Sequence, residues 1–425
     1  MIRIINYSEI ENKEIVASPK PTESVASVVA EILARVKNEG DKALLEYAER
    51  FDKVKLSSLR VSEEEIAEGV ASVEKEFIEI LEKSAKNIRE YHEKQRRDGF
   101  EIRREKGVVL GQKVTPIERV GLYVPGGTAA YPSTVLMDAI PAKIAGCEKV
   151  VMVTPPGKDG RLPAVILAAA KVAGVDEIYK VGGAQAIGAL AYGTESVPKV
   201  YKIVGPGNAF VAEAKKQVFG QVSIDMIAGP SEILVVADGK NDPDCIAADL
   251  LSQAEHDRNA SAVLITDDPD FAKAVQGAVE GLLEGMERRE IARASIDNNG
   301  KIIVVKDLEQ GIDVANDIAP EHLELAVEDP FAYLDKVRHA GSVFLGRFCP
   351  EPIGDYYAGM NHTLPTCGTA RFSSALSVDD FVKKTQYAYY TDAALADVAG
   401  EVAAFARKEG LTGHARSATI RSEKK

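Results

Sequence analysis

Several features by which protein classes are often recognised are missing from this sequence. It has no tryptophan, and no apolar run approaches the ~20 residues of a membrane-spanning helix. Charges interrupt the apolar residues at the start, so the continuous apolar region of a secretory signal is also absent. The four cysteines have no CxxC spacing and are too few for a disulfide framework in 425 residues. These absences predict a cytoplasmic protein without a membrane partner.

Positive charge is in short supply. The 52 lysines and arginines are outnumbered by 65 aspartates and glutamates, and the net charge of -13 argues against nucleic acid as a principal partner. Hydrophobic residues, by contrast, make up 45% of the chain and there are 34 glycines, a composition typical of a globular α/β enzyme. The length of 425 residues predicts more than one domain.

Helical periodicity fills the region from Thr22 to about Gln95. Ser62 and Glu65 match a capping box, and a long amphipathic pattern with Glu/Lys pairs at i and i+4 follows them. We expect these charges to form an ordinary exposed helix face.

Strand and helix patterns alternate along the rest of the chain. Short strands are expected between residues 101 and 124, and the apolar runs VVMVT, EIYKV, VYKIV and EILVVA follow, separated by Ala-rich helical stretches. A second alternation begins where Pro243 opens a helix and continues through SAVLIT, KIIVVK, HLELAV and SVFLG. The spacing predicts βαβ units, and therefore two α/β globules with mainly parallel sheets.

Glycine-rich turns follow the strands of the first globule, among them YVPGG, VGGAQA and VGPGNAF. Such turns are compatible with a nucleotide crevice, because they let the backbone approach a phosphate at a helix N-terminus, but taken alone they are better explained as ordinary tight turns. The standard GxGxxG motif is missing, since Gly207 is followed by Asn208, Ala209 and Phe210. A dinucleotide would therefore need a non-standard loop in an incomplete Rossmann-like domain.

Only six histidines are present, so each can be examined as a candidate. Gln253 and His256 lie three apart in LLSQAEHD, where one helix face could direct both to a metal ion; a surface or capping role is the alternative. Glu321 and His322 open the apolar run HLELAV, a position suited either to acid/base chemistry or to an ordinary ion pair. The isolated His414 in the tail has no role that its neighbours indicate.

Residues 346–374 are predicted to form a long loop, and loops of this length with aromatic side chains are usually functional. Asp355 and His362 lie in it. Cys349 and Cys367 lie there too, but no adjacent histidine or basic cluster would stabilise a thiolate. We therefore expect all four cysteines to be structural.

Eight motifs occur together in a fixed order. They read VGLYVPGG, VGGAQAIGALAYGTESVPKV, GPGNAFV, AGPSEILV, LLSQAEHD, APEHLE, GDYYAGMNHTLPT and LTGH. In this order the chain resembles the histidinol dehydrogenase family, from about Ser24 to about Thr419. The resemblance implies a zinc ion in each subunit and two NAD-linked oxidations, from L-histidinol through L-histidinal to L-histidine, in the last steps of histidine biosynthesis.

The resemblance also implies a role for individual residues, matched motif by motif. The acid/base pair falls on Glu321 and His322. The zinc ligands fall on Gln253, His256, Asp355 and the partner subunit's His414. Substrate contacts fall on Ser231, Gln253, His256, His322, Asp355, Glu409 and His414. NAD contacts fall on Tyr123, Gln185 and Asn208.

This ligand set suits the implied chemistry. Nitrogen and oxygen ligands without thiolate suit zinc and leave positions for the imidazole and amine of histidinol. His322 is expected to take the hydroxyl proton while hydride leaves, and Glu321 to activate water for the second oxidation. No cysteine is needed.

The family resemblance further implies a division of the chain and an intertwined homodimer with shared active sites. Residues 119–232 form the NAD-binding globule. Residues 21–118 are expected to pack with residues 233–370 as the metal-bearing globule. Residues 1–20 are an N-terminal arm, and residues 371–425 form the dimerisation extension.

Three other functions remain open from the residues. A zinc hydrolase could use the same ligands with a glutamate base, although the glycine-rich turns argue against it. A related dehydrogenase could oxidise another amino or sulfonated alcohol on this scaffold. A purely structural zinc protein would leave Glu321 and His322 without a reason to lie near the metal.

Overall fold

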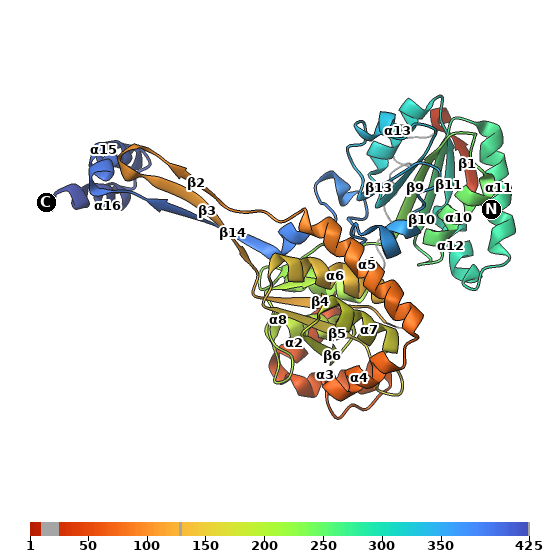
Figure 1. The fold of residues 1–425 in the computed structure, drawn as a ribbon, viewed down its shortest axis with the longest axis horizontal. Helices are drawn as coiled ribbons and strands as arrows, with labels where there is room; N and C mark the ends of the chain where they lie inside the picture. The colour runs from red at the N-terminus through yellow and green to blue at the C-terminus, as the bar shows by residue number, and fades with distance from the viewer. Residues whose placement is uncertain (10–24, 127–129, 424–425) are drawn as a thin grey trace. The chain divides into compact units, whose positions relative to one another are not determined.

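The computed structural model describes residues 1–9, 25–126 and 130–423 (Figure 1). The chain divides into two compact units. Unit 1 comprises Met1–Gln95 and Glu118–Phe381, and unit 2 comprises Arg96–Ile117 and Val382–Lys425. Most of the expected N-terminal arm lies outside the described residues. Within the described part of the chain, no helix has the length and apolar character needed to cross a membrane.

The first sheet of unit 1 has five parallel strands in the order β6-β5-β4-β7-β8. Its strands are β4 (Arg119–Tyr123), β5 (Lys149–Thr154), β6 (Glu177–Lys180), β7 (Lys202–Val204) and β8 (Ser223–Ile224). The helices between them are α6 (Pro132–Ala145), α7 (Ala164–Ala173), α8 (Gly183–Tyr192) and α9 (Ala209–Val218). The predicted alternation is confirmed. From β4 the chain adds β5 and β6 on one side, and then returns to add β7 and β8 on the other side of β4. The strand order therefore reverses between β4 and β7.

The N-terminal helices pack on this five-stranded sheet. They are α2 (Ala26–Glu39), α3 (Asp41–Tyr47), α4 (Glu63–Ala71) and α5 (Lys75–Glu93). Val29, Leu33 and Val36 of α2 join one buried cluster with Ile187 and Leu190 of α8. The expectation that residues 21–118 pack with residues 233–370 is therefore wrong for most of this region, because its apolar faces meet the Ala-rich helices of the first globule. Helix α5 also contacts the later segment around residues 354–359.

The long amphipathic pattern forms two helices rather than one. The Ser62 side chain accepts the Glu65 backbone N–H at 3.1 Å and caps α4, as the capping box predicts. The helix ends at Ala71, and α5 begins at Lys75. The Glu65 carboxylate forms an ion pair with Lys180 at 2.7 Å, so it fastens α4 to the end of β6.

The second sheet of unit 1 has six parallel strands in the order β1-β11-β10-β9-β12-β13. They are β1 (Arg3–Asn6), β9 (Glu232–Ala237), β10 (Ser261–Thr266), β11 (Lys301–Val304), β12 (His322–Ala326) and β13 (Ser342–Leu345). The helices are α10 (Pro243–Ala254), α11 (Pro269–Leu283), α12 (Arg289–Asn299), α13 (Leu308–Ile318) and α14 (Phe331–Leu334). From β9 to β13 the strand order repeats that of the first sheet, so the two globules share element order, and residues 3–6 of the expected arm add an edge strand.

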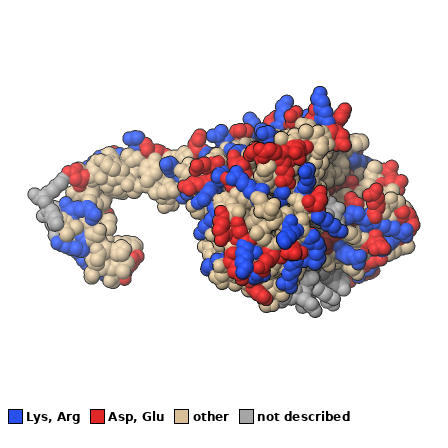
Figure 2. Space-filling model, turned by 90° about the horizontal axis from the view of Figure 1, so that it is seen from below, with Lys and Arg blue, Asp and Glu red and all other residues tan. Residues whose placement is uncertain are grey.

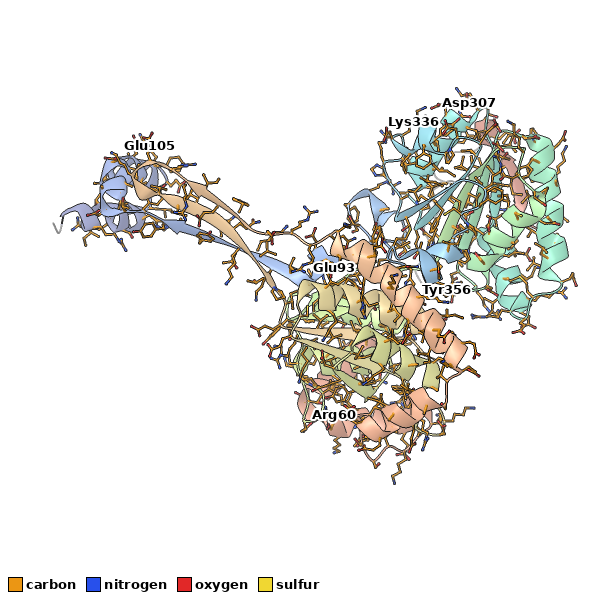
Figure 3. The ribbon with its side chains drawn as sticks, viewed as in Figure 1. Arg60, Glu93, Glu105, Asp307, Lys336 and Tyr356 are labelled. Carbon is orange, nitrogen blue, oxygen red and sulfur yellow. The ribbon has the colours of Figure 1, made fainter. Side chains whose placement is uncertain are left out.

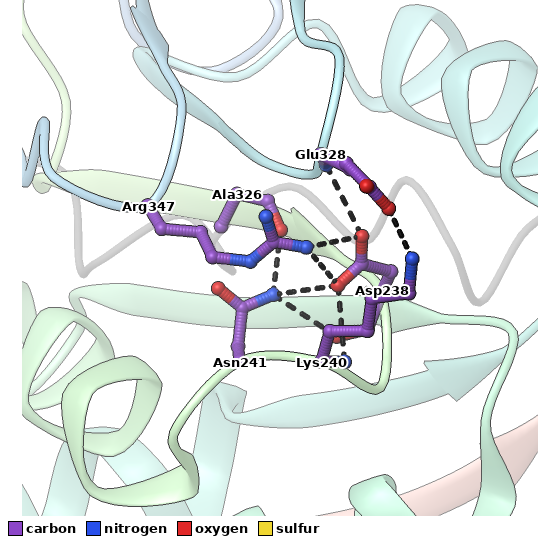
Figure 4. A network of polar contacts seen from close by, with 6 residues as sticks. All are labelled: Asp238, Lys240, Asn241, Ala326, Glu328 and Arg347. Carbon is purple, nitrogen blue, oxygen red and sulfur yellow. Dashed lines mark hydrogen bonds and ion pairs between the residues drawn. The ribbon is translucent and has the colours of Figure 1, made fainter.

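A polar network joins the carboxyl ends of β9 and β12, where the strand order of this second sheet reverses (Figure 4). Arg347 donates to both carboxylate oxygens of Asp238 at 2.6 Å. Asn241 donates to the Ala326 carbonyl at 2.6 Å. Lys240 forms an ion pair with Glu328. These contacts join the carboxyl ends of β9 and β12 to the segment after β13.

Unit 2 contains an antiparallel sheet in the order β14-β3-β2 and a helical hairpin. Its elements are β2 (Phe100–Arg103), β3 (Val109–Pro116), β14 (Val382–Tyr389), α15 (Asp392–Lys408) and α16 (Thr412–Glu423). The strands expected near residues 101–124 and the strand-like TQYAYYT segment are confirmed. The boundaries differ from the expectation: residues 371–381 belong to unit 1, and residues 96–117 join the C-terminal segment.

Candidate functional site

His322 and Glu321 lie where the amino ends of β9 and β12 are paired. The Glu321 carboxylate accepts the Glu232 backbone N–H at 2.9 Å, and His322 Nδ1 lies 2.9 Å from the Glu232 carbonyl oxygen. A carbonyl only accepts, so Nδ1 carries the proton and Nε2 presents a lone pair. Both side chains are buried, and His322 Nε2 has no hydrogen-bond partner among the described residues. The main chain of Glu232 thus orients both members of the predicted acid/base pair.

Two carboxylates approach His322 from the predicted functional loop. Glu351 Oε1 lies 3.5 Å from His322 Nε2. One ligand atom each of His322, Glu351 and Asp355 lies within 4.8 Å of the other two, close enough to hold a metal ion. Asp355 lies in the short helical turn η4 (Gly354–Ala358), and its neighbour Tyr356 marks this turn in Figure 3. The structure therefore brings Asp355 to the predicted acid/base pair.

Gln253 and His256 approach the same cluster from α10, but not on one helical face. The helix ends at Ala254, and the His256 backbone N–H donates to the Gln253 carbonyl at 3.1 Å in the turn that follows. The buried Gln253 side chain hydrogen-bonds Glu351. Burial lowers the pKa of His256, and the nearby Asp355 carboxylate partly opposes this shift. The predicted proximity holds, and the predicted shared helical face is wrong.

Burial dominates the electrostatics of the cluster. It lowers the pKa of His322, even though Asp355 and the Glu232 carbonyl act to raise it. It raises the pKa of Glu321 well above the ordinary value, and it raises the pKa of Glu351 to about 10, with Asp355 adding to the shift. Neutral histidines and carboxyl groups that resist ionisation are what burial without a cation produces. A divalent cation would favour the ionised carboxylates and leave the His322 imidazole neutral, so the residues present fit a metal.

Two members of the cluster were not assigned a role from the sequence. Glu351 precedes Asp355 by four residues, and the turn between them is closed by the Gly354 and Asp355 N–H groups on the Glu351 carbonyl, at 2.8 and 3.4 Å. That spacing in PEPIGDYY was an available signal for a second acid. His362 acts on the pKa of both His256 and His322. It lies in the loop expected to be functional, but no motif argument singled it out.

The remaining predicted substrate residues lie in two different places. Ser231 directly precedes β9, is half-buried, and its carbonyl accepts the Ser261 N–H at 3.0 Å. Glu409 directly follows α15 and His414 lies on α16, and both are exposed in unit 2. Their approach to the cluster stays a prediction.

All three predicted NAD residues line one cavity of about 970 Å³ at the carboxyl ends of the first sheet. Tyr123 ends β4, and its hydroxyl accepts the Gly183 N–H at 3.2 Å. Gln185 lies in the first turn of α8. The Asn208 side-chain oxygen caps α9 by accepting from Phe210 and Val211 at 3.0 and 3.2 Å. Gly183, with a φ of +65°, lets the chain turn into α8 beside the cavity.

The opposite wall of this cavity comes from the N-terminal helices. Tyr47, Phe51 and Asp52 line it from α3 and the turn that follows. The Phe51 ring stacks on Tyr47, with centroids 5.3 Å apart and planes 4° from parallel. Partial burial raises the pKa of Asp52 to about 6. Sequence reasoning missed this wall because it assigned the N-terminal helices to the other globule.

The local charge at Cys367 agrees with the expected structural role of the cysteines. Its backbone N–H donates to the Glu232 carboxylate at 3.1 Å. Burial and this carboxylate raise the pKa of the thiol, which disfavours the thiolate needed by a nucleophile.

Comparison with known proteins gives a consistent result. A family model described as histidinol dehydrogenase matches residues 17–422. Histidinol dehydrogenase of Geobacillus kaustophilus is 57% identical over 403 residues, which cover 95% of each chain. That of Clostridium acetobutylicum is 51% identical over 426 residues, 99% of each chain. A crystal structure of histidinol dehydrogenase from Elizabethkingia anophelis aligns with a TM-score of 0.94 at 40% identity, covering 100% of this chain and 98% of that one.

Proposed function

Because the chain belongs to the histidinol dehydrogenase family of oxidoreductases, we propose that it oxidises L-histidinol through L-histidinal to L-histidine with two molecules of NAD. These are the final steps of histidine biosynthesis. The observation that carries the proposal is His322, whose Nε2 lone pair is oriented by the Glu232 carbonyl into a buried cluster of metal-binding side chains. A base fixed in this way is suited to take a proton from a bound hydroxyl group.

The metal would be zinc, held by Gln253, His256 and Asp355 together with the partner subunit's His414. Zinc binds imidazole nitrogen and carboxylate oxygen, and as a Lewis acid it would bind the imidazole and amine of histidinol. One ligand atom each of Asp355, Glu351 and His322 lies within 4.8 Å of the other two, and this concentration of metal-binding side chains supports a cation at this place. Glu351 hydrogen-bonds Gln253 and so adds a further acid beside the ligands.

The protein's own groups would move the protons. In the first oxidation, His322 takes the hydroxyl proton while the carbinol carbon transfers hydride to NAD. In the second, Glu321 takes a proton from water as its oxygen adds to the aldehyde carbon. His322 then takes a hydroxyl proton from the resulting hydrate during the second hydride transfer. Ser231, next to Glu232, would contact the substrate, and so would Glu409.

NAD would bind in the cavity at the carboxyl ends of β4 and β7. Ligands of open α/β sheets bind where the strand order reverses, and here that place is lined by Tyr123 and Asn208, with Gln185 close by. The first globule would thus be a Rossmann-like domain without the standard glycine motif. In the second globule, the Asp238–Arg347 network occupies the corresponding edge, which explains why only one cofactor domain is proposed.

Unit 2 would mediate a homodimer with shared active sites. Its large apolar side chains are unusually exposed, among them Phe100, Ile102, Tyr389 and Phe405. Figure 2 shows tan surface over much of this unit, whereas positive and negative side chains are interspersed over unit 1. Apolar surface of this kind is typical of a face that another chain covers. It supports the proposal that α16 brings His414 to a neighbouring subunit.

The test compares substrates on the zinc-loaded, full-length protein. L-Histidinol with NAD should give NADH with a kcat/KM at least about a hundredfold above that of amino alcohols without imidazole. A substrate that lacks the imidazole leaves the buried polar groups of the site without a partner, which weakens binding of its transition state. A higher kcat/KM for a sulfonated or simple amino alcohol would exclude L-histidinol as the preferred substrate and would still support an NAD-linked alcohol oxidation. Amide cleavage without NADH would establish the hydrolase alternative.

A further inference from the structure

Glu324 is a buried acid on the face of β12 that packs against α10. On β12 it shares a face with His322 and Ala326, since side chains alternate along a strand. Ala326 packs with Ala247 and Leu250 of α10. Glu324 is only 3% exposed on this face. Burying a carboxyl group among apolar side chains is costly unless its hydrogen bonds are made, so its contacts indicate what it is for.

Two partners satisfy Glu324, and they come from two other elements. Its Oε1 accepts the Glu351 backbone N–H at 2.7 Å. Its carboxyl group also lies within hydrogen-bonding reach of the Asp249 carboxyl group on α10. Because a carboxylate only accepts, the two groups bond when one of them is protonated. Consistently, burial raises the pKa of Glu324 well above its usual value and that of Asp249 to about 6.

These contacts join the three elements that carry the candidate metal site. Asp249 lies one helical turn before Gln253. Glu324 follows His322 by two residues on β12. The Glu351 N–H begins the turn that ends at Asp355. A hydrogen bond at the first residue of that turn fixes the position of the carboxylate at its end.

We propose that the Glu324–Asp249 carboxyl pair is a positioning element of the metal site, which fixes the turn from Glu351 to Asp355 against α10. Glu324 does not touch the metal or the substrate. It acts by holding the backbone of Glu351, and through it the direction of the Asp355 carboxylate. The inference rests on the proposed zinc site and adds residues that no motif assigned.

The test measures zinc affinity by chelator competition on full-length protein. Glu324→Leu keeps the approximate volume and removes the acceptor for the Glu351 N–H. We expect its zinc affinity to fall about 10- to 100-fold, the range found when outer partners of metal ligands are lost. Glu324→Gln retains an acceptor for Glu351 and can donate to Asp249, so its affinity should stay within about threefold of wild type.

Asn241→Leu is the matched control. It removes a side-chain hydrogen bond to the backbone at the other end of β12, at Ala326, and should lower the melting temperature without changing zinc affinity. A second readout separates positioning from general destabilisation. In Glu324→Leu the KM for L-histidinol should rise, while the KM for NAD stays unchanged.

Three results overturn the inference. Zinc affinity of wild-type strength in Glu324→Leu contradicts it and leaves the proposed function intact. An equal loss of affinity in Asn241→Leu shows that any weakening of β12 has the same effect. A wild-type protein that binds no zinc refutes this inference and the proposed function together. If Glu324→Leu does not fold, Asp249→Ala decides in its place, with a severalfold loss of zinc affinity expected and an unchanged affinity contradicting the proposal.

Discussion

His322 Nδ1 lies 2.9 Å from the carbonyl oxygen of Glu232, and this single contact determines which ring nitrogen is available for chemistry. The two residues begin adjacent parallel strands, so the contact is built into the register of β9 and β12. The backbone N–H of the same Glu232 donates a hydrogen bond to the Glu321 carboxylate. One peptide segment therefore orients both predicted acid/base groups before any ligand arrives.

His322→Ala should lower kcat about 10²- to 10⁴-fold, which is the usual contribution of a general base. The zinc content should remain at the wild-type level, because Gln253, His256, Asp355 and the partner's His414 are the proposed ligands. Turnover and metal content are measured on the same preparation. Full activity would exclude His322 as the base, and loss of zinc would make it a ligand.

His414→Ala should reduce zinc affinity, because the change removes a proposed ligand. Dimers that combine one His414→Ala chain with one His322→Ala chain test where this ligand comes from. If His414 serves the neighbouring subunit, one of the two sites in such a dimer is intact, and about half the wild-type activity returns. Mixed dimers with no more activity than the parent variants would show that His414 serves its own chain.

Zinc should stabilise the folded protein. A ligand that binds only the folded state contributes about 4 kcal/mol at a concentration of 1,000 Kd. The melting temperature should therefore rise with added zinc and level off at one ion per subunit. The double variant Gln253→Ala/His256→Ala is the control and should show little of this rise. An equal rise in that variant would place the zinc elsewhere.

Asp138→Asn should change how stability depends on pH. Asp138 is fully buried near Asp225 and Lys215 and accepts a hydrogen bond from Thr363 at 3.0 Å. Burial and the Asp225 charge raise the pKa of Asp138 to about 8. The folded state thus keeps a proton that the unfolded chain releases near pH 4, so wild-type stability falls as pH rises from about 4 to about 8.

The asparagine side chain does not titrate, so this fall should be smaller in Asp138→Asn. The melting temperature of the variant minus that of wild type should therefore increase as the pH rises from 5 to 8. A constant difference across this range would show that the wild-type Asp138 side chain does not hold its proton. Glu148→Gln, which changes a surface carboxyl group, is a suitable control.

Asp238→Ala should destabilise unit 1 by about 1–3 kcal/mol without affecting zinc affinity, because the substitution leaves Arg347 partly buried without its partner. Denaturant unfolding measures the loss, and Lys240→Ala on the exposed ion pair with Glu328 should cost much less. Equal costs for the two variants would show that burial of the Asp238–Arg347 pair contributes nothing.

Local sequence patterns predicted the two parallel sheets, because strand and helix periodicity and Ala-rich helices are properties of neighbouring residues. They did not predict the partner of the N-terminal helices. An apolar stripe such as Val29, Leu33 and Val36 specifies that a face is buried and not which surface covers it. The second cavity wall, including Phe51 and Asp52, was missed for this reason.

The candidate site was predictable to the extent that motifs carry it. Asp355 lies beside His322, and Gln253 and His256 approach them although α10 ends before His256; their roles as ligands stay a prediction. Glu351 and Glu324 were not found. Their roles depend on burial and on contacts across elements. The spacing of Glu351 from Asp355 was a signal that could have been used, whereas a single acid in an apolar strand, such as Glu324, gives no local signal.

The central claim is a two-step, zinc-dependent oxidation of L-histidinol at the Gln253–His256–Asp355 cluster with His322 as the base. The most direct test is the amount of NADH formed when zinc-loaded protein consumes a known, limiting amount of L-histidinol. We expect two NADH and one L-histidine per histidinol, and none after zinc is removed with a chelator. One NADH with accumulation of the aldehyde, or no NADH, would contradict it.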